Sequence, residues 1–144
     1  AMFLRKKITG KLLIIYIPAQ ILGCLLGVML ANVFFEHNIL ELSTKNRDGF
    51  HIFLSEIIAT FGLIFIIFAT LKDGKITIAA SVATYIMAGY WFTSSTSFAN
   101  PAVAIARTFT DSFTGINYMN TPTYILAEFL GALIAVFLIK KLIK

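Results

Sequence analysis

Asn100 and Pro101 are the residues best suited to do chemistry in this chain, because together they start a helix directly after a polar segment. Asn is a preferred N-cap residue, since its side-chain oxygen accepts a hydrogen bond from a free backbone N–H. Pro is favoured at the first helical position, where an N–H would have no partner. The amide nitrogen of Asn100 remains a donor. This pattern predicts a helix start at Asn100, which is either an ordinary N-cap in an extramembrane loop or, within a membrane, a cap whose amide also donates to a permeating molecule.

The stretch around Asn100 has the composition of a loop followed by a half-length helix. Residues 94–97 are small and polar, and no charge occurs before Arg107. The apolar residues 103–106 are too few to cross a bilayer. Irregular backbone at membrane depth is tolerated only where it is buried in protein or lines a wet cavity. We therefore predict a re-entrant segment, with a helix that continues to about Phe113.

The composition identifies the class of protein. Of the 144 residues, 58% are hydrophobic and only 13% are charged, whereas soluble domains are about half apolar and a quarter charged. The formal net charge of +5 does not indicate a nucleic-acid partner, because the basic residues lie at the ends of apolar runs, as in membrane proteins. Cys24 is the only cysteine, and no cluster of catalytic or metal-ligating residues is visible. We expect a lipid-embedded protein that is not an enzyme and has no cofactor or metal.

Four apolar stretches are long enough to span a membrane. They cover residues 12–35, 50–71, 76–93 and 122–139. The expected fold class is an all-α membrane protein with four transmembrane helices and one re-entrant half-helix, in a single domain over residues 1–144.

The basic residues orient this layout. Four spans place both termini and the turn at residues 72–75 on one side, which collects nine of the twelve Lys and Arg residues. These nine are Arg5, Lys6, Lys7, Lys11, Lys72, Lys75, Lys140, Lys141 and Lys144. By the positive-inside rule, both ends face the cytoplasm and the re-entrant loop enters from outside.

An internal repeat relates the first and last spans. Residues 16–25 align without gaps to residues 124–133. Small residues recur every four positions in both, which lets another helix approach closely; they include Gly23, Gly27 and Gly131. Because the two copies cross the membrane in opposite directions, they indicate inverted repeats. The offset places the partner of Asn100 a few residues before Ala1, so we expect the chain to begin where a first re-entrant helix ends.

Two carboxylates lie inside apolar stretches, where ionisable residues are functional or structural by default. Glu128 is near mid-span, and its repeat mate is Gln20, which favours a polar bracing role. Glu56 lies nearer the predicted outer surface and has a second interpretation, that it simply reaches water.

These motifs resemble the aquaporin and aquaglyceroporin family, the major intrinsic proteins, over essentially the whole chain. The resemblance is carried by Asn100-Pro101-Ala102, by Ser-Glu-Ile-Ile-Ala-Thr-Phe-Gly at 55–62 and by Ala-Gln-Ile-Leu-Gly at 19–23. It implies the third to sixth spans of a six-span inverted-repeat bundle, without the first two spans and the first Asn-Pro-Ala loop. It also implies a passive channel for water or small uncharged solutes in a bacterial inner membrane, a homotetramer when full-length, and a Glu56 that accepts bonds from the loop N–H groups.

The resemblance also suggests a pore. In the family an Arg usually follows the second Asn-Pro-Ala, but here the residue is Val103. The partner position, about a dozen residues before the Asn, is Ala88, so we expect a filter wide enough for glycerol or a metalloid hydroxide. Arg107 shares the face of Val103 one turn on, and either lines the outer vestibule, reaches the outer interface or pairs with Asp111. Ser97 completes the candidate pore residues.

A secondary transporter is the alternative function, because broken helices and inverted repeats occur in transporters too. Transporters usually place ionisable residues near the binding site for ion coupling. Residues 76–106 contain no charged residue, which favours the channel.

Overall fold

The described part of the chain is entirely helical apart from its loops. A computed structural model describes residues 1–6 and 8–142, and these contain no β-strand. Lys7 and Lys144, two of the nine basic residues assigned to the cytoplasmic side, lie outside the described residues. The elements are α1 (Gly10–Phe34), α2 (Phe50–Ala69), α3 (Lys75–Phe92), α4 (Pro101–Ala106), the 3-10 turn η1 (Arg107–Phe109) and α5 (Thr121–Leu142). The all-α prediction is confirmed.

The long helices follow the apolar stretches closely, and each boundary lies within three residues of its predicted position. Among the described residues, α1, α2 and α5 are long and apolar enough to cross a membrane. The remaining predicted span, residues 76–93, is the 18-residue helix α3, which is less apolar because it includes Thr77, Ser81 and Thr84.

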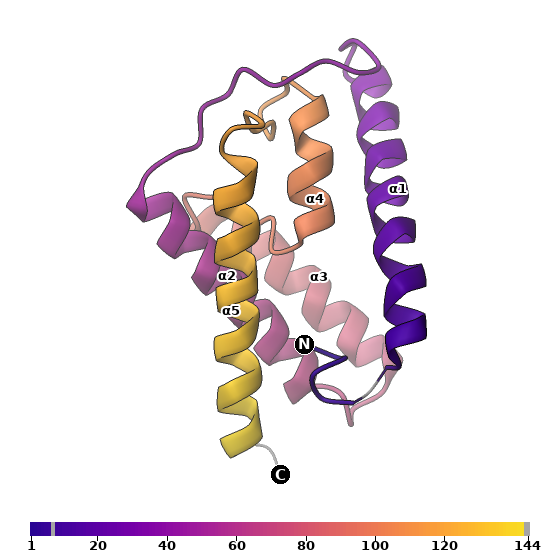
Figure 1. The fold of residues 1–144 in the computed structure, drawn as a ribbon, viewed down its shortest axis with the longest axis vertical. Coiled ribbons are helices and arrows are strands. Elements are labelled where there is room, and N and C mark those ends of the chain that lie inside the picture. The colour runs from indigo at the N-terminus through magenta and orange to yellow at the C-terminus, as the bar shows by residue number, and fades with distance from the viewer. Residues whose placement is uncertain (7, 143–144) are drawn as a thin grey trace.

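Helices α2 and α5 form the centre of the bundle and pack against each other along their lengths, while α3 packs on α2 (Figure 1). Helix α1 makes its contacts with α4 and η1, on the far side of the re-entrant segment. The short helix α4 therefore lies between α1 and α5 and is held from both sides. Helices α1 and α5 run in opposite directions, as inverted repeats require (Figure 1).

The predicted helix-packing glycines differ in their surroundings. Gly131 of α5 is buried where α5 crosses α2, and a β-carbon there would collide with the backbone oxygen of Ile57. On α1, a β-carbon at Gly23 or Gly27 would meet nothing within 4 Å among the described residues. Within the described part of the chain, another helix therefore packs closely on Gly131 of the second repeat and not on Gly23 of the first.

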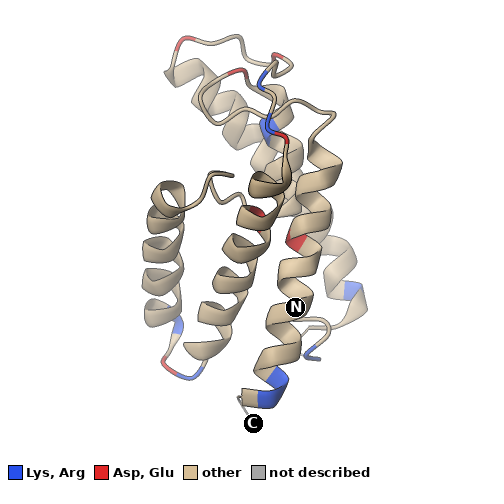
Figure 2. Ribbon diagram, turned by 90° about the vertical axis from the view of Figure 1, so that its left-hand side faces the viewer, with Lys and Arg blue, Asp and Glu red and all other residues tan. Residues whose placement is uncertain are grey.

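Charged residues gather at the two ends of the bundle, and the helices between them are almost uncharged (Figure 2). The N-terminus, the end of α5 and the turn between α2 and α3 lie at one end, opposite the long loop that joins α1 to α2 (Figure 1). The predicted orientation across the membrane depends on these segments lying on the same side.

Candidate functional site

The re-entrant segment turns into α4 at Asn100. The Asn100 Oδ1 atom accepts a hydrogen bond from the Ala102 N–H at 2.9 Å, and Pro101 occupies the first helical position. Because the side-chain oxygen is used by the cap, the Nδ2 amino group is the end left free. It makes no hydrogen bond to any residue that the structure describes.

The short helix ends earlier than predicted. It stops at Ala106 instead of about Phe113, and after η1 the chain is extended at Thr110. The reason is tertiary: the Thr110 hydroxyl donates to Asn32 Oδ1 at 2.6 Å, and the Asn32 amide donates to the Phe109 carbonyl at 3.2 Å. Asn32 is the buried polar residue near the end of α1. These bonds hold the chain away from the helical path.

The loop before Asn100 has unusual backbone geometry. Thr96, Ser97 and Ala99 have φ values of 65°, 51° and 51°, in the left-handed region that non-glycine residues avoid. Each such residue costs of order 1–3 kcal/mol and persists only where its surroundings fix it. All three are buried, so the neighbouring helices must hold the loop in place.

Two buried carboxyl groups hold the loop backbone. Glu56 Oε1 on α2 accepts a short hydrogen bond from the Ala99 N–H, and Glu128 Oε1 on α5 accepts one from the Asn100 N–H at 3.1 Å. The side chains are 0% and 1% exposed, respectively. Glu56 therefore does not reach water, which excludes its second interpretation. Two successive N–H groups at the start of α4 are bound from two different helices.

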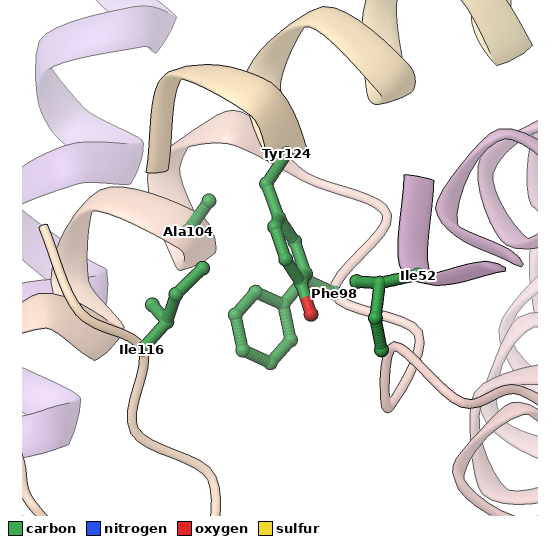
Figure 3. Close-up of a cluster of buried hydrophobic side chains, with 5 residues drawn as sticks. All are labelled: Ile52, Phe98, Ala104, Ile116 and Tyr124. Atoms are coloured by element: carbon green, nitrogen blue, oxygen red, sulfur yellow. The ribbon is translucent and has the colours of Figure 1, made fainter. Parts of the chain in front are cut away.

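An apolar cluster supports the same loop from its other side. Phe98 packs against Tyr124 of α5 with ring centroids 5.0 Å apart. Figure 3 shows the two rings beside Ile52, Ala104 and Ile116, which come from α2, α4 and the loop before α5. The Tyr124 hydroxyl also donates to the Ser95 carbonyl at 3.2 Å. Polar and apolar contacts together fix the backbone on both sides of Ala99.

Val103 and Arg107 line hollows next to α1. One cavity of about 220 Å³ is bounded by Val103, Ala106 and Arg107, together with the small residues Gly27 and Ala31 of α1. A larger one of about 530 Å³ lies toward the C-terminal end of α1, and its wall includes Arg107 and polar side chains such as Asn32, Thr110 and Thr114.

Arg107 does not pair with Asp111. Its guanidinium donates to the Thr114 hydroxyl instead, while Asp111 accepts bonds from Ser43 and Thr44. The alternative in which Arg107 pairs with Asp111 is therefore excluded, because the chain between the two residues leaves the helical path after Phe109.

The remaining candidate residues are placed differently. Ala88 is exposed on α3 and lies outside both cavities lined by Arg107. Ser97 is buried, and a β-carbon at its neighbour Gly89 would stand only 2.6 Å from the Ser97 Oγ atom. Gly89 was not predicted as a site residue, although a glycine just before a polar loop is a usable sign of close backbone approach.

Asp111 binds the long loop between α1 and α2. Its carboxylate accepts from the Thr44 N–H at 2.9 Å and from the hydroxyls of Thr44 and Ser43. The Thr44 backbone bond is the main reason that the pKa of Asp111 lies below its usual value of 3.8. Arg47 binds from the other direction, donating to the Gly115 carbonyl at 2.8 Å.

This contact leads to a pH prediction. A carboxyl group with a lowered folded-state pKa contributes stability that is complete above its unfolded pKa and is lost as the pH falls through the folded one. We expect Asp111→Asn to lower the unfolding temperature at neutral pH, with the difference from wild type shrinking below about pH 4. Thermal unfolding of both proteins across this range measures it. Asp73→Asn, in the turn at the opposite end, is the matched control, and a difference that stays constant with pH would contradict the prediction.

No metal site accompanies these residues: within residues 1–6 and 8–142, no group of three or more His, Cys, Asp or Glu side chains could hold an ion. The site consists of hydrogen-bond donors and acceptors around a re-entrant helix start.

Comparison with known proteins agrees with this geometry. The family model described as "Major intrinsic protein" matches residues 1–138. The chain is 43% identical over 129 residues to "Aquaglyceroporin AqpS" of Rhizobium meliloti (strain 1021), an alignment that covers 90% of this chain and 55% of the relative. The chain thus spans about half the length of the curated relative it matches. No solved structure matches it.

Proposed function

The chain belongs to the major intrinsic protein family, and we propose that it forms part of a passive membrane channel for water and small uncharged solutes. The observation that carries this proposal is the Asn100 cap. Because Oδ1 is bound to the Ala102 N–H, the Nδ2 group of Asn100 is left to donate to a passing oxygen atom. Hydrogen-bond donors that replace part of a solute's hydration shell are how pores select by chemistry.

The support beneath Asn100 fits this role. A donor that selects solutes has to stay in place as each one passes, and Glu56 and Glu128 bind the backbone at Ala99 and Asn100. We propose that these carboxylates brace the loop and contact no solute themselves, since both are buried. Pro101 and the buried Ala102 complete the loop, the small Ala102 side chain allowing a second loop to approach.

We propose a filter wide enough for glycerol-sized molecules or metalloid hydroxides. Val103 occupies the position where an Arg usually narrows the pore of family members, and it faces a cavity together with Arg107. The name of the related Rhizobium protein, an aquaglyceroporin, is in keeping with this size class. Arg107 then lines the outer approach to the filter. Ser97 contributes to the pore only as part of the loop before Asn100, and Ala88 only as part of α3.

The membrane setting completes the proposal. The protein is an integral membrane protein, given its family and its three long apolar helices. We propose that it lies in a bacterial inner membrane with both ends of this chain in the cytoplasm, and that the full-length protein is a homotetramer.

Flux measurements test the proposal against the transporter alternative. The full-length protein that contains this chain is reconstituted in vesicles, and water and glycerol permeabilities are measured by the rate of vesicle shrinkage or swelling. We expect both rates to rise above those of empty vesicles, to hardly saturate with solute and to ignore an imposed ion gradient. Saturable flux that follows the ion gradient would favour the transporter.

A further inference from the structure

Half of the oxygen atoms in the two loop-binding carboxyl groups have no visible partner. Glu56 and Glu128 each use Oε1 to accept a loop N–H. The Oε2 atom of each is buried and has no hydrogen bond to any residue that the structure describes. The two side chains, one on α2 and one on α5, lie close together because they bind the N–H groups of successive residues, Ala99 and Asn100. Buried acceptors without donors are rare, so each of these oxygens requires an explanation.

Hydroxyl groups of the described residues lie around the pair. The Tyr85 hydroxyl of α3 donates to backbone carbonyls of α2, and the Tyr124 hydroxyl of α5 donates to the Ser95 carbonyl. The Ser95 hydroxyl lies beside Glu56. No Lys, Arg or His of the described residues forms an ion pair with either carboxyl group.

Two ionised carboxylates side by side in this setting would repel each other strongly, because both side chains are buried and charges interact more strongly away from bulk solvent. Carboxyl groups that share a buried site avoid this by keeping one proton between them. Full protonation is also unfavourable, since hydrogen bonds from the loop N–H groups are roughly twice as strong to an ionised acceptor. A single proton on the pair removes the repulsion and still leaves one ionised acceptor for the loop N–H groups. A single O–H···O bond would also satisfy both unpartnered oxygens, one as the donor and the other as the acceptor.

We propose that Glu56 and Glu128 hold one proton between their Oε2 atoms, so that the pair carries a single negative charge. The proton joins α2 to α5 directly beneath the loop, while both Oε1 atoms stay bound to successive loop N–H groups. The pair acts as a positioning device for Asn100, through the backbone. This inference rests on buried contacts within the chain and does not depend on which solute passes.

Infrared spectroscopy of the full-length protein tests the proposal. The C=O stretch of a protonated carboxyl group is separate from that of a carboxylate and shifts in D₂O. At about pH 7, where exposed carboxyl groups are ionised, we expect the wild-type spectrum to contain one protonated carboxyl band that the Glu56→Gln/Glu128→Gln double variant lacks. The band should shift slowly in D₂O because the pair is buried. A wild-type spectrum with no such band overturns the proposal without any variant.

The single variants determine the number of protons. In Glu56→Gln or Glu128→Gln, the amide N–H replaces the O–H as donor and the remaining carboxyl group is ionised, so we expect each single variant to lose the band completely. A band that remains in either single variant means that both groups are protonated, which overturns the proposal. Glu36→Gln, at an exposed carboxyl group on the outer loop, should leave the band unchanged.

A stability comparison separates the shared proton from simple space filling. Glu128→Gln keeps an acceptor for the Asn100 N–H and adds a donor to Glu56, so it should unfold close to the wild-type temperature. Glu128→Leu fills the same space with no polar atom and should unfold at a clearly lower temperature. Equal unfolding temperatures for the two variants would overturn the positioning role.

Discussion

Val103→Arg in the full-length protein is expected to reduce glycerol permeability by roughly tenfold or more, while water permeability falls far less. Val103 borders a cavity of about 220 Å³ beside α1. An arginine side chain there would fill the space through which a glycerol-sized molecule is proposed to pass. A tenfold loss corresponds to about 1.4 kcal/mol added to the barrier, which is small compared with the cost of forcing a solute past a bulky side chain.

The charge of the new residue adds to its bulk. Residues 103 and 107 are one helical turn apart, so an arginine at 103 would lie beside Arg107. Like charges at this spacing repel, and we expect the new guanidinium to be pushed away from Arg107 into the open cavity. Val103→Met adds length without charge and separates the two effects. Permeabilities to water and glycerol are measured side by side in vesicles at matched protein content.

Two outcomes would contradict the proposed filter. A wild-type protein that passes water and excludes glycerol would rule out a wide filter, whatever the variant does. Equal losses of water and glycerol flux in Val103→Arg would indicate general damage to the pore rather than a change in its width.

The sequence was sufficient to predict the helices because each apolar stretch has polar or charged residues at its ends. The predicted bounds of α2 illustrate this, since residues 50–71 were expected and Phe50–Ala69 is found. The carboxylates in apolar stretches also stood out, because Glu56 and Glu128 have almost no charged neighbours in sequence. Which N–H group each one binds required the fold.

The features that could not be predicted depend on contacts between distant parts of the chain. The early end of α4 follows from bonds between Asn32 and Thr110, which are 78 positions apart. The left-handed backbone at Thr96, Ser97 and Ala99 has no glycine to indicate it. A pair between Arg107 and Asp111 was one alternative offered by helical spacing, and that spacing does not apply once the chain turns at residue 110.

The glycines at the matching position of the two repeats have different surroundings. The same sequence pattern places Gly23 on α1 and Gly131 on α5, yet only Gly131 meets another helix within the described residues.

Gly131→Ala should be one of the most destabilising single-methyl changes in this chain. The added β-carbon would collide with the Ile57 carbonyl oxygen and stand 3.0 Å from the Phe61 nitrogen, and both are backbone atoms that cannot rotate away. Overpacking of this kind typically costs about 1–3 kcal/mol, although alanine favours a helix over glycine by up to about 1 kcal/mol. We expect a lower unfolding temperature and lower yield of the full-length protein in detergent. Gly10→Ala is the matched control, because its β-carbon would meet only the Phe3 ring, at 3.6 Å. If Gly131→Ala unfolded at the same temperature as Gly10→Ala, the close approach of α5 to α2 would be wrong, and so would the shared support that these helices give to the Asn100 loop.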